Sequence, residues 1–344
     1  MQPWSNAFHT HLRYSPLMRR LFLALTLLPF LHAQWIMQPA PTTAGLRGIH
    51  ALNSGLAWTS GTNGTILRTT NGGQTWQNCS IPSDAEQLDF RAVQAFNETS
   101  AIIMSAGKGD LSRIYKTTDA CRTWKLLFTN PDKEGFWDAL HFSTANFGVV
   151  LGDPVDGHFP IFVTSNGGKA WRRLANDHVP KAKEGQAIFA ASNSSLFIGS
   201  KNQKIYFVTG GGANELIEVN LKSAKPTATN LPGLALGPTA GAFSLGVRTQ
   251  GGRMVTVTVG GDYKFPGQTK DTASSAVQPP SGFRSAVAYD TAAKHWIAVG
   301  PNGTDISTDD GVTWRAQPGA EQNWNALSLP FVVGPKGRIG KLTR

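Results

Sequence analysis

The sequence predicts an all-β fold, a seven-bladed β-propeller made of four-stranded antiparallel blades. Three observations support this prediction: a short turn motif recurs at nearly constant spacing, a strand pattern recurs before it, and the composition suits short strands joined by tight turns. Only 16% of the 344 residues are charged, and the chain holds 37 glycines and 20 prolines. Propellers of this length form one closed domain, so the length does not require two.

The turn motif follows the pattern S/T-x-D/N-x-G-x-T-W, with its glycine missing from the second copy and Ala in place of Thr in the third. The acid or amide and the tryptophan of the four copies are Asn71 and Trp76, Asp119 and Trp124, Asn166 and Trp171, and Asp309 and Trp314. The first three copies lie about 48 residues apart, and the fourth follows after about three further periods. A short Asp or Asn side chain can bind the N–H groups of its own turn, while glycine supplies a positive φ. We therefore expect these eight residues to be structural, with one hairpin turn in each blade.

A repeated strand pattern precedes the motif. Segments that begin at Arg47, Arg91, Trp137, Arg284 and Trp324 are predicted to form the innermost strands of five blades. Two more inner strands are expected near residues 186–191 and 241–247, which brings the number to seven.

The two ends of the chain are predicted to share one blade. The last repeat stops after three strands, and the segment that begins at Gln34 resembles the strand that follows a motif tryptophan. Pairing the N-terminal strand with the last blade would close the ring and remove the exposed edges of an open array.

The N-terminal residues 1–33 are predicted to be a signal peptide. An apolar run at residues 21–33 follows Arg19 and Arg20 and is too short to span a bilayer comfortably. Met18 directly precedes these arginines and is an alternative start. Residues 34–344 would then form an exported propeller, periplasmic or secreted, with no transmembrane span in the mature chain; an uncleaved anchor is the alternative.

Charge and cysteine content narrow the partners. The formal net charge is +10, and the predicted signal peptide accounts for three arginines and no acidic residue. The remaining positive charge favours acidic glycans, anionic lipid surfaces or acidic protein patches; its scattered distribution gives no reason to expect nucleic acid. Cys79 and Cys121 fall in equivalent regions of neighbouring repeats, and in an exported chain they are candidates for a disulfide, although the sequence leaves the pairing open. Neither cysteine has a partner at metal-ligand spacing, and no cofactor motif is present, so neither metal nor cofactor is expected.

These motifs, together with the glycine-containing turns at residues 61–64, 301–303 and 335–337, make residues 34–344 resemble the Asp-box (BNR) propellers. Within that group the chain is most similar to bacterial relatives of the photosystem II stability and assembly factor. The resemblance implies a non-enzymatic propeller that assists assembly or stability of an extracytoplasmic or membrane complex. Its partner would be a protein or protein complex, and we expect the chain to be a monomer.

The binding surface is expected on the face opposite the turn motifs, where the strand 2–3 loops and the connections between blades meet. Two of these loops, at residues 152–157 and 260–263, are longer and acidic; an insertion that caps its own turn is the alternative explanation. The candidate binding residues on this face are Arg47, Arg91, Trp137, Asp138, Asp153, Asp156, Glu184, Asp262, Tyr263, Arg284 and Trp324.

A second hypothesis is a sialidase-like or other glycoside hydrolase that acts on extracellular glycans. Such an enzyme would draw on Asp138, Asp153, Glu184 and Tyr263 as acid, base and nucleophile, beside arginines that converge on a substrate carboxylate. Two carboxyls roughly 5–10 Å apart would suffice for hydrolysis. The Arg-Ile-Pro sequence that usually accompanies sialidase domains is absent. We therefore favour binding, whereas an Asp138–Glu184 pair in a closed pocket would favour hydrolysis.

Overall fold

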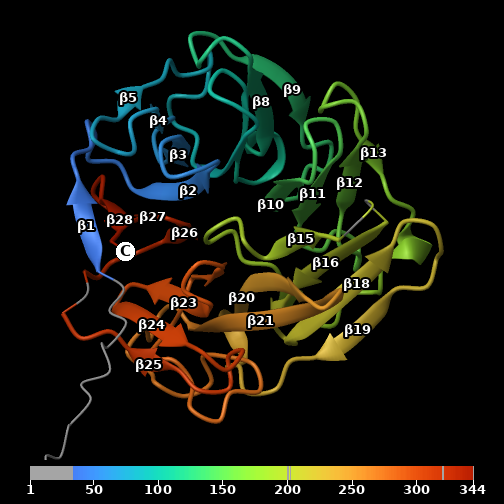
Figure 1. The fold of residues 1–344 in the computed structure, drawn as a ribbon. Coiled ribbons are helices and arrows are strands. Elements are labelled where there is room, and N and C mark those ends of the chain that lie inside the picture. The colour runs from blue at the N-terminus through green and yellow to red at the C-terminus, as the bar shows by residue number, and fades with distance from the viewer. Residues whose placement is uncertain (1–33, 200, 202, 320, 344) are drawn as a thin grey trace, which may run out of the picture. The chain divides into compact units, whose positions relative to one another are not determined.

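The computed structural model describes residues 34–199, 201, 203–319 and 321–343, and the predicted signal peptide lies outside the described residues. Within these residues seven four-stranded antiparallel sheets are arranged around a central axis (Figure 1). The predicted seven-bladed propeller is confirmed. No helix among the described residues is long and apolar enough to cross a membrane.

Four blades follow the predicted order of four consecutive strands. The first holds β2 (Leu46–Ala51), β3 (Ala57–Gly61), β4 (Ile66–Thr69) and β5 (Gln77–Asn78). The second holds β6 (Phe90–Ala95), β7 (Ala101–Ser105), β8 (Arg113–Thr117) and β9 (Lys125–Thr129). The third holds β10 (Trp137–Phe142), β11 (Gly148–Gly152), β12 (Ile161–Thr164) and β13 (Arg172–Arg173). The sixth holds β22 (Ala286–Asp290), β23 (His295–Gly300), β24 (Gly303–Ser307) and β25 (Arg315–Ala316).

The fourth and fifth blades are interleaved along the chain. One sheet joins β15 (Leu196–Ile198), β16 (Lys204–Val208), β18 (Glu215–Asn220) and β19 (Thr227–Asn230). The other joins β14 (Gln186–Ala187), β17 (Gly210–Gly211), β20 (Gly237–Gln250) and β21 (Arg253–Asp262). Single 3₁₀ turns, η1 (Gly109–Leu111) and η2 (Asn176–His178), lie in connections.

The seventh blade confirms the predicted closure of the ring. It holds β26 (Ala326–Ser328), β27 (Phe331–Val333) and β28 (Ile339–Leu342), and β1 (Trp35–Gln38) pairs antiparallel with β28. Trp35 lies opposite Leu342 in this register. Its indole N–H also donates to Thr304 Oγ1 of the sixth blade at 2.9 Å. The N-terminal strand therefore completes the last blade and also contacts its neighbour.

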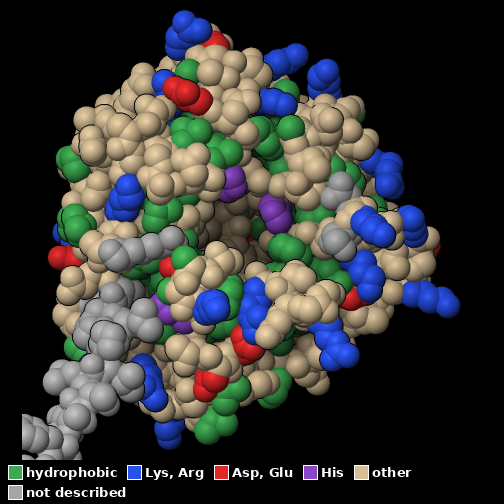
Figure 2. All heavy atoms as spheres, viewed as in Figure 1, with side chains coloured by type: hydrophobic (Ala, Val, Ile, Leu, Met, Phe, Trp, Pro, Cys, Tyr) green, Lys and Arg blue, Asp and Glu red, His purple; other side chains and the backbone are tan. Residues whose placement is uncertain are grey.

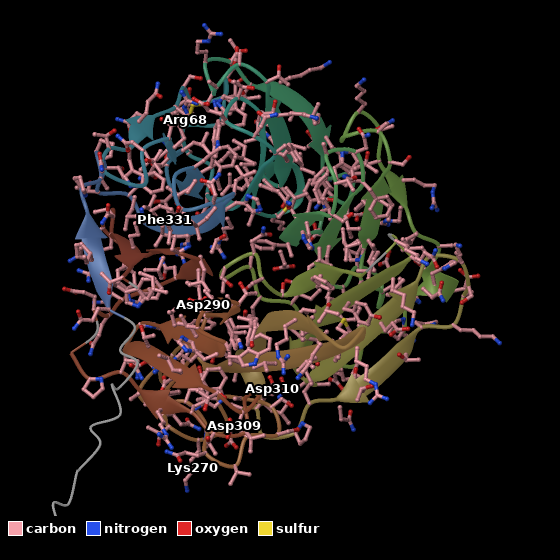
Figure 3. All side chains as sticks on the ribbon, in the orientation of Figure 1. Arg68, Lys270, Asp290, Asp309, Asp310 and Phe331 are labelled. Atoms are coloured by element: carbon pink, nitrogen blue, oxygen red, sulfur yellow. A yellow bond between two sulfur atoms is a disulfide. The ribbon has the colours of Figure 1, made fainter. Side chains whose placement is uncertain are left out.

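The turn motifs form the same hydrogen bonds in each of the four regular blades that carry one. In the sixth blade Asp309 Oδ1 accepts the N–H of Thr313 at 2.9 Å, and Ser307 Oγ accepts the N–H of Gly311 at 2.9 Å. The neighbouring Asp310, labelled beside Asp309 in Figure 3, binds Arg248 of β20 at 2.6 Å and so links the fifth and sixth blades. Cys79 and Cys121 form a disulfide, with their Cα atoms 5.2 Å apart.

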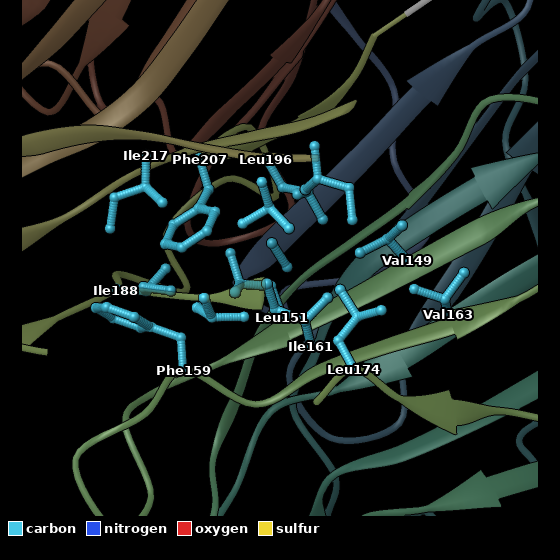
Figure 4. Close-up of a cluster of buried hydrophobic side chains, with 14 of the residues drawn as sticks. Val149, Leu151, Phe159, Ile161, Val163, Leu174, Ile188, Leu196, Phe207 and Ile217 are labelled. Carbon is cyan, nitrogen blue, oxygen red and sulfur yellow. The ribbon is translucent and has the colours of Figure 1, made fainter. Parts of the chain in front are cut away.

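The hydrophobic core lies between the faces of neighbouring sheets. Figure 4 shows one such cluster, in which Val149 and Leu151 of β11 and Ile161 of β12 pack with Leu196 and Phe207 of the fourth blade. The second strands of the regular blades, β3, β7, β11 and β23, thus bury both faces, one against each neighbouring blade, which explains their continuous apolar runs, whereas the outermost strands β5, β13 and β25 are exposed.

One of the two further inner strands is confirmed, and the other is confirmed only at its start. Residues 241–247 lie within β20 as expected. Of residues 186–191, the first two form β14 and pair with β17 as the start of β2 pairs with the end of β3, and the strand beside β16 follows only at β15 (Leu196–Ile198). Only Gln186–Ala187 are in a strand, and the chain then crosses the centre of the ring.

Candidate functional site

The centre of the ring holds a cavity of about 550 Å³ on the face opposite the turn motifs. The start of β2 and the loop after β11 both contribute to its wall, which places it on the face where the sequence predicts binding. Six of the predicted binding residues line it: Arg47, Arg91, Asp138, Asp153, Tyr263 and Trp324. The inner strands bring these residues together although the chain separates them by up to about 280 positions.

Residues 188–194 are here called the channel-crossing segment. The first part of this segment forms the floor of the cavity, where Ile188 and Ala190 line it. The N–H of Ile188 donates to Asp153 Oδ1 of the third blade at 2.9 Å. The carbonyl of Ala190 accepts from Arg91 Nη1 of the second blade at 3.1 Å. The acid and the arginine therefore hold this segment in place.

The rest of the channel-crossing segment is held by three blades. Ser192 Oγ donates to the carbonyl of Ser285 at 2.7 Å. The Asn193 side chain pairs with both backbone groups of Leu140, at 2.7 and 2.9 Å. The carbonyl of Ser194 accepts the N–H of Leu245 at 2.8 Å. Since its polar groups are bound by side chains and backbone of separate blades, the segment closes the ring centre without forming a blade strand.

A second, smaller cavity of about 190 Å³ lies on the other side of this segment. Its lining includes His50, His141 and residues 192–194, and Figure 2 shows histidine side chains beside a hollow at the centre of this face. Burial lowers the pKa of His50 to about 4, and burial together with the His50 charge does the same for the pKa of His141. Both rings are therefore neutral at pH 7.

Two arginines make one side of the larger cavity positively charged, and only Arg91 forms an ion pair there. Arg91 Nε binds Asp89 Oδ2 at 2.8 Å. Arg47 Nε is buried and has no hydrogen-bond partner among the described residues. Burial lowers the pKa of Arg47, and the nearby Arg91 charge lowers it further against the opposing effect of Asp89. An anionic group placed between the two guanidinium groups would relieve this repulsion.

Two acids line the cavity beside the arginines. Burial raises the pKa of Asp138 well above its usual range, and the Asp153 carboxylate adds to the effect against the opposing charge of Arg91. Burial likewise raises the pKa of Asp153 to about 6. Asp138 Oδ2 has no hydrogen-bond partner in the described part of the chain. Burial therefore favours the protonated form of Asp138, in which the carboxyl group can donate a hydrogen bond.

The other predicted residues lie away from the cavity surface. Trp137 and Arg284 are fully buried, and Arg284 forms an ion pair with Asp305. Asp262 accepts hydrogen bonds from Thr239 Oγ1 and the N–H of Lys264, so it caps its own turn. Asp156 and Glu184 are exposed and do not line the cavity. The Asp138–Glu184 pair that would favour hydrolysis is therefore not formed there.

Sequence reasoning missed the phenylalanines of the cavity wall, which are Phe136, Phe189, Phe243 and Phe283. A signal for two of them was present, because an aromatic residue directly precedes the first residue of the inner-strand pattern in several repeats, as in Phe136-Trp137 and Phe283-Arg284. No group of three or more His, Cys, Asp or Glu side chains that could hold a metal occurs among the residues that the structure describes.

Comparison with known proteins gives the chain a family. Residues 30–341 match the model of the photosynthesis system II assembly factor YCF48 family. A chloroplast photosystem II stability/assembly factor, HCF136 of Oryza sativa subsp. japonica, is 30% identical over 147 residues, which cover 41% of this chain and 33% of the relative. The matched region thus spans about a third of the length of that curated relative.

Two solved structures share the fold. A structure of YCF48 bound to D1 peptide aligns with a TM-score of 0.60 at 18% identity and covers 90% of this chain and 97% of the other. YCF48 from Cyanidioschyzon merolae aligns with a TM-score of 0.59 at 19% identity and covers 90% and 99%. With the family model matched along nearly the whole propeller, the chain belongs to the YCF48 family of photosystem II assembly factors.

Proposed function

We propose that the chain is an exported, non-catalytic propeller that binds a segment of another protein in its central cavity, and thereby assists assembly or stability of an extracytoplasmic or membrane protein complex. The observation that carries this proposal is a preformed cavity of about 550 Å³ at which Arg47, with its buried Nε unpartnered, stands near a second arginine, Arg91. Cavities of this size bind small ligands or short segments of a chain.

The arginines favour a ligand with a carboxylate. Arg presents several N–H donors in a planar group that matches a carboxylate, and such charged hydrogen bonds are stronger than neutral ones. Asp153 accepts the N–H of Ile188, and Arg91 donates to the carbonyl of Ala190. These bonds order the floor of the cavity and the two side chains that form them, so a ligand would meet a preorganised surface. A relative with this fold has been solved with a D1 peptide bound, which is compatible with a protein segment as the ligand.

A titration with a fluorescent D1 peptide that contains acidic residues tests this proposal. We expect Arg47→Gln to weaken binding about tenfold, because a hydrogen bond to a charged group contributes about 1.5–3 kcal/mol. The matched control is Arg253→Gln, which changes an exposed arginine at the far end of the β20–β21 hairpin. Equal binding by Arg47→Gln and the unchanged chain would contradict the proposal.

Export is a separate part of the proposal and rests on the sequence of residues 1–33. Expression in a bacterium followed by fractionation and mass measurement of the mature chain tests it. We expect the chain outside the cytoplasm with Gln34 as its first residue. A chain recovered intact from the cytoplasm would overturn this part and leave the binding proposal standing.

Hydrolysis remains the second candidate because Asp138, whose pKa burial raises, lines one cavity together with Asp153 and Tyr263. The bond from Asp153 to the N–H of Ile188 supports a positioning role for that acid instead. A panel of chromogenic glycosides separates the two functions when the unchanged chain is compared with Asp138→Ala and Glu184→Ala. Turnover that Asp138→Ala abolishes would replace binding with catalysis.

A further inference from the structure

The cavity wall has two chemically different sides. The arginines come from the first and second blades, whereas the opposite side is aromatic and comes from the channel-crossing segment and the fifth and sixth blades. This aromatic side consists of Phe189, Phe243, Phe283 and Tyr263, here called the aromatic wall. A ligand that fills the cavity would therefore meet charge on one side and rings on the other.

The rings of the aromatic wall are held in contact with one another. Phe189 stacks on Phe243 with centroids 4.0 Å apart and planes 5° from parallel. Phe283 and Tyr263 meet Phe243 edge to face, with centroids at 4.7 and 6.2 Å. Such packing fixes each ring at little further entropic cost when a ligand binds.

Exposed apolar side chains follow and precede the aromatic wall along the chain and are here called the rim. Tyr263, which lines the cavity, is 44% exposed, and Phe265, two residues later, is 66% exposed. Leu236 is 65% exposed and lies three residues before Thr239, whose carbonyl accepts the N–H of Tyr263 at 3.2 Å. Exposed apolar side chains grouped near a cavity commonly mark an interaction site.

The turn that carries this rim is ordered. Asp262 Oδ1 accepts from Thr239 Oγ1 at 2.8 Å and from the N–H of Lys264 at 2.9 Å. The carbonyl of Pro266 accepts from the N–H of Phe283 and from Asn302 Nδ2, both at 3.0 Å. The backbone that carries Tyr263 and Phe265 is therefore held in place.

We propose that the aromatic wall and the Tyr263–Phe265 rim form a subsite for an apolar side chain of the same protein segment whose acidic group binds Arg47 and Arg91. This inference rests on the proposed function and adds to it the composition of the ligand: an acidic residue with a large apolar residue a few positions away. The unpartnered Nε of Arg47 beside Arg91 favours a negatively charged group, and the rings that line the same cavity place the apolar side chain next to it. Aromatic residues are the usual anchors at such interfaces.

Selection from a phage-displayed library of random dodecapeptides against the full chain tests this inference. We expect enriched peptides to combine Asp or Glu with Leu, Ile, Phe or Trp. One enriched peptide is then synthesised in three forms, the selected sequence, its acid replaced by Asn or Gln, and its apolar residue replaced by Ala, and each is titrated by fluorescence anisotropy.

The protein variants separate the subsite from the arginines. We expect Phe265→Ala and Tyr263→Ala each to lower the affinity for the selected peptide at least about fivefold, the usual threshold for an interface anchor. The affinity for the peptide whose apolar residue is replaced by Ala should not change in either variant. Val277→Ala is the matched control, because Val277 is 81% exposed and its N–H pairs with Val312 outside the cavity.

The outcomes distinguish the two proposals. Loss of affinity with Arg47→Gln but unchanged affinity with both aromatic variants would overturn the subsite and retain the proposed function. Unchanged affinity with all three variants, or failure of the library to yield any binder, would overturn both.

Discussion

Arg47 of the first blade and Arg284 of the sixth begin the same inner-strand pattern but have opposite environments. Arg284 is fully buried and binds Asp305, Asn302 Oδ1 and the carbonyl of Phe283. Arg47 is only partly buried, lines the central cavity and leaves its Nε without a partner among the described residues. The sequence pattern aligns these two arginines, but in the structure they are one position apart. Arg284 holds the buried position of Leu46, since both donate their N–H to the preceding blade, and Ser285 lines the cavity at the position of Arg47.

The buried position that Arg284 holds in the sixth blade belongs to Leu46 in the first. Asp305 stands on β24 at the same position relative to the turn motif as Leu67 on β4, and both side chains are buried. The apolar pair Leu46 and Leu67 of the first blade is thus replaced by the ion pair Arg284–Asp305 in the sixth. A buried arginine is tolerated at this repeat position because its own blade supplies the opposite charge.

The largest effect is expected when this partner is removed. Asp305→Leu gives the sixth blade the residue type of the first and leaves Arg284 charged and buried, so we expect a loss of about 3–5 kcal/mol in the free energy of unfolding. Urea unfolding at pH 7 measures it. The double variant Arg284→Met/Asp305→Leu should recover most of the loss, and Arg47→Met should change stability by less than about 1 kcal/mol. Normal stability of Asp305→Leu alone would break the comparison.

Asp153 offers a second contrast with Asp305, because it is buried beside an N–H group and not in an ion pair. Burial raises the pKa of Asp153 to about 6, so the fold favours its protonated form. This contribution to stability is complete below about pH 4 and is lost as the pH rises through 6. Asp153→Asn keeps an oxygen for the Ile188 N–H, and we expect it to raise the free energy of unfolding at pH 7.5 by about 1–3 kcal/mol.

Thermal unfolding of Asp153→Asn and the unchanged chain at pH 7.5 and pH 4.5 measures this gain. The difference between the two proteins should shrink at the lower pH, and Asp156→Asn, which changes an exposed acid, should show no such trend. A gain of the same size at both pH values would mean that charge burial is not its cause.

The regular blades were predictable because their signals are local. The turn motifs, the inner-strand pattern and the closure by β1 all follow from residues that are neighbours in sequence or repeat within one period. Asp309, for example, binds Thr313 only four residues away. Such patterns specify a blade without knowledge of its surroundings.

The channel-crossing segment could not be predicted in the same way. Buried and half-buried residues alternate along it as in a strand. Its position, however, depends on distant residues, since Asn193 bonds to Leu140, 53 residues away, and Ser192 to Ser285, 93 residues away. The face of the cavity and most of its polar residues were predictable, and its aromatic wall was not, because phenylalanines in strands ordinarily indicate core.

The turn motif of the second blade offers a smaller contrast with its counterparts. Ala120 and Cys121 adopt a φ of 61°, where the first blade has Gly72 and Gly73 at 72° and 85°. A non-glycine residue is strained in this region. We expect Ala120→Gly to raise the free energy of unfolding by about 0.5–1 kcal/mol, as measured by urea unfolding. Gly72→Ala should have the opposite effect, and a loss of stability in both variants would show that the backbone conformation is not the cause.

The smallest effect is expected from the acid of the same motif. Asp119 stands where the first and third blades have Asn71 and Asn166, and hydrogen bonds from the side chain and backbone of Thr123 lower the pKa of Asp119 to about 2. The fold therefore favours its ionised form, so this contribution to stability is present above about pH 4 and is lost as the pH falls toward 2. Asp119→Asn should melt slightly below the unchanged chain at pH 6, and the difference should vanish by pH 2 to 3 if both remain folded there. Melting curves recorded at several pH values decide it, because a difference that is independent of pH would assign the effect to packing and not to the charge that distinguishes this turn from its two amide counterparts.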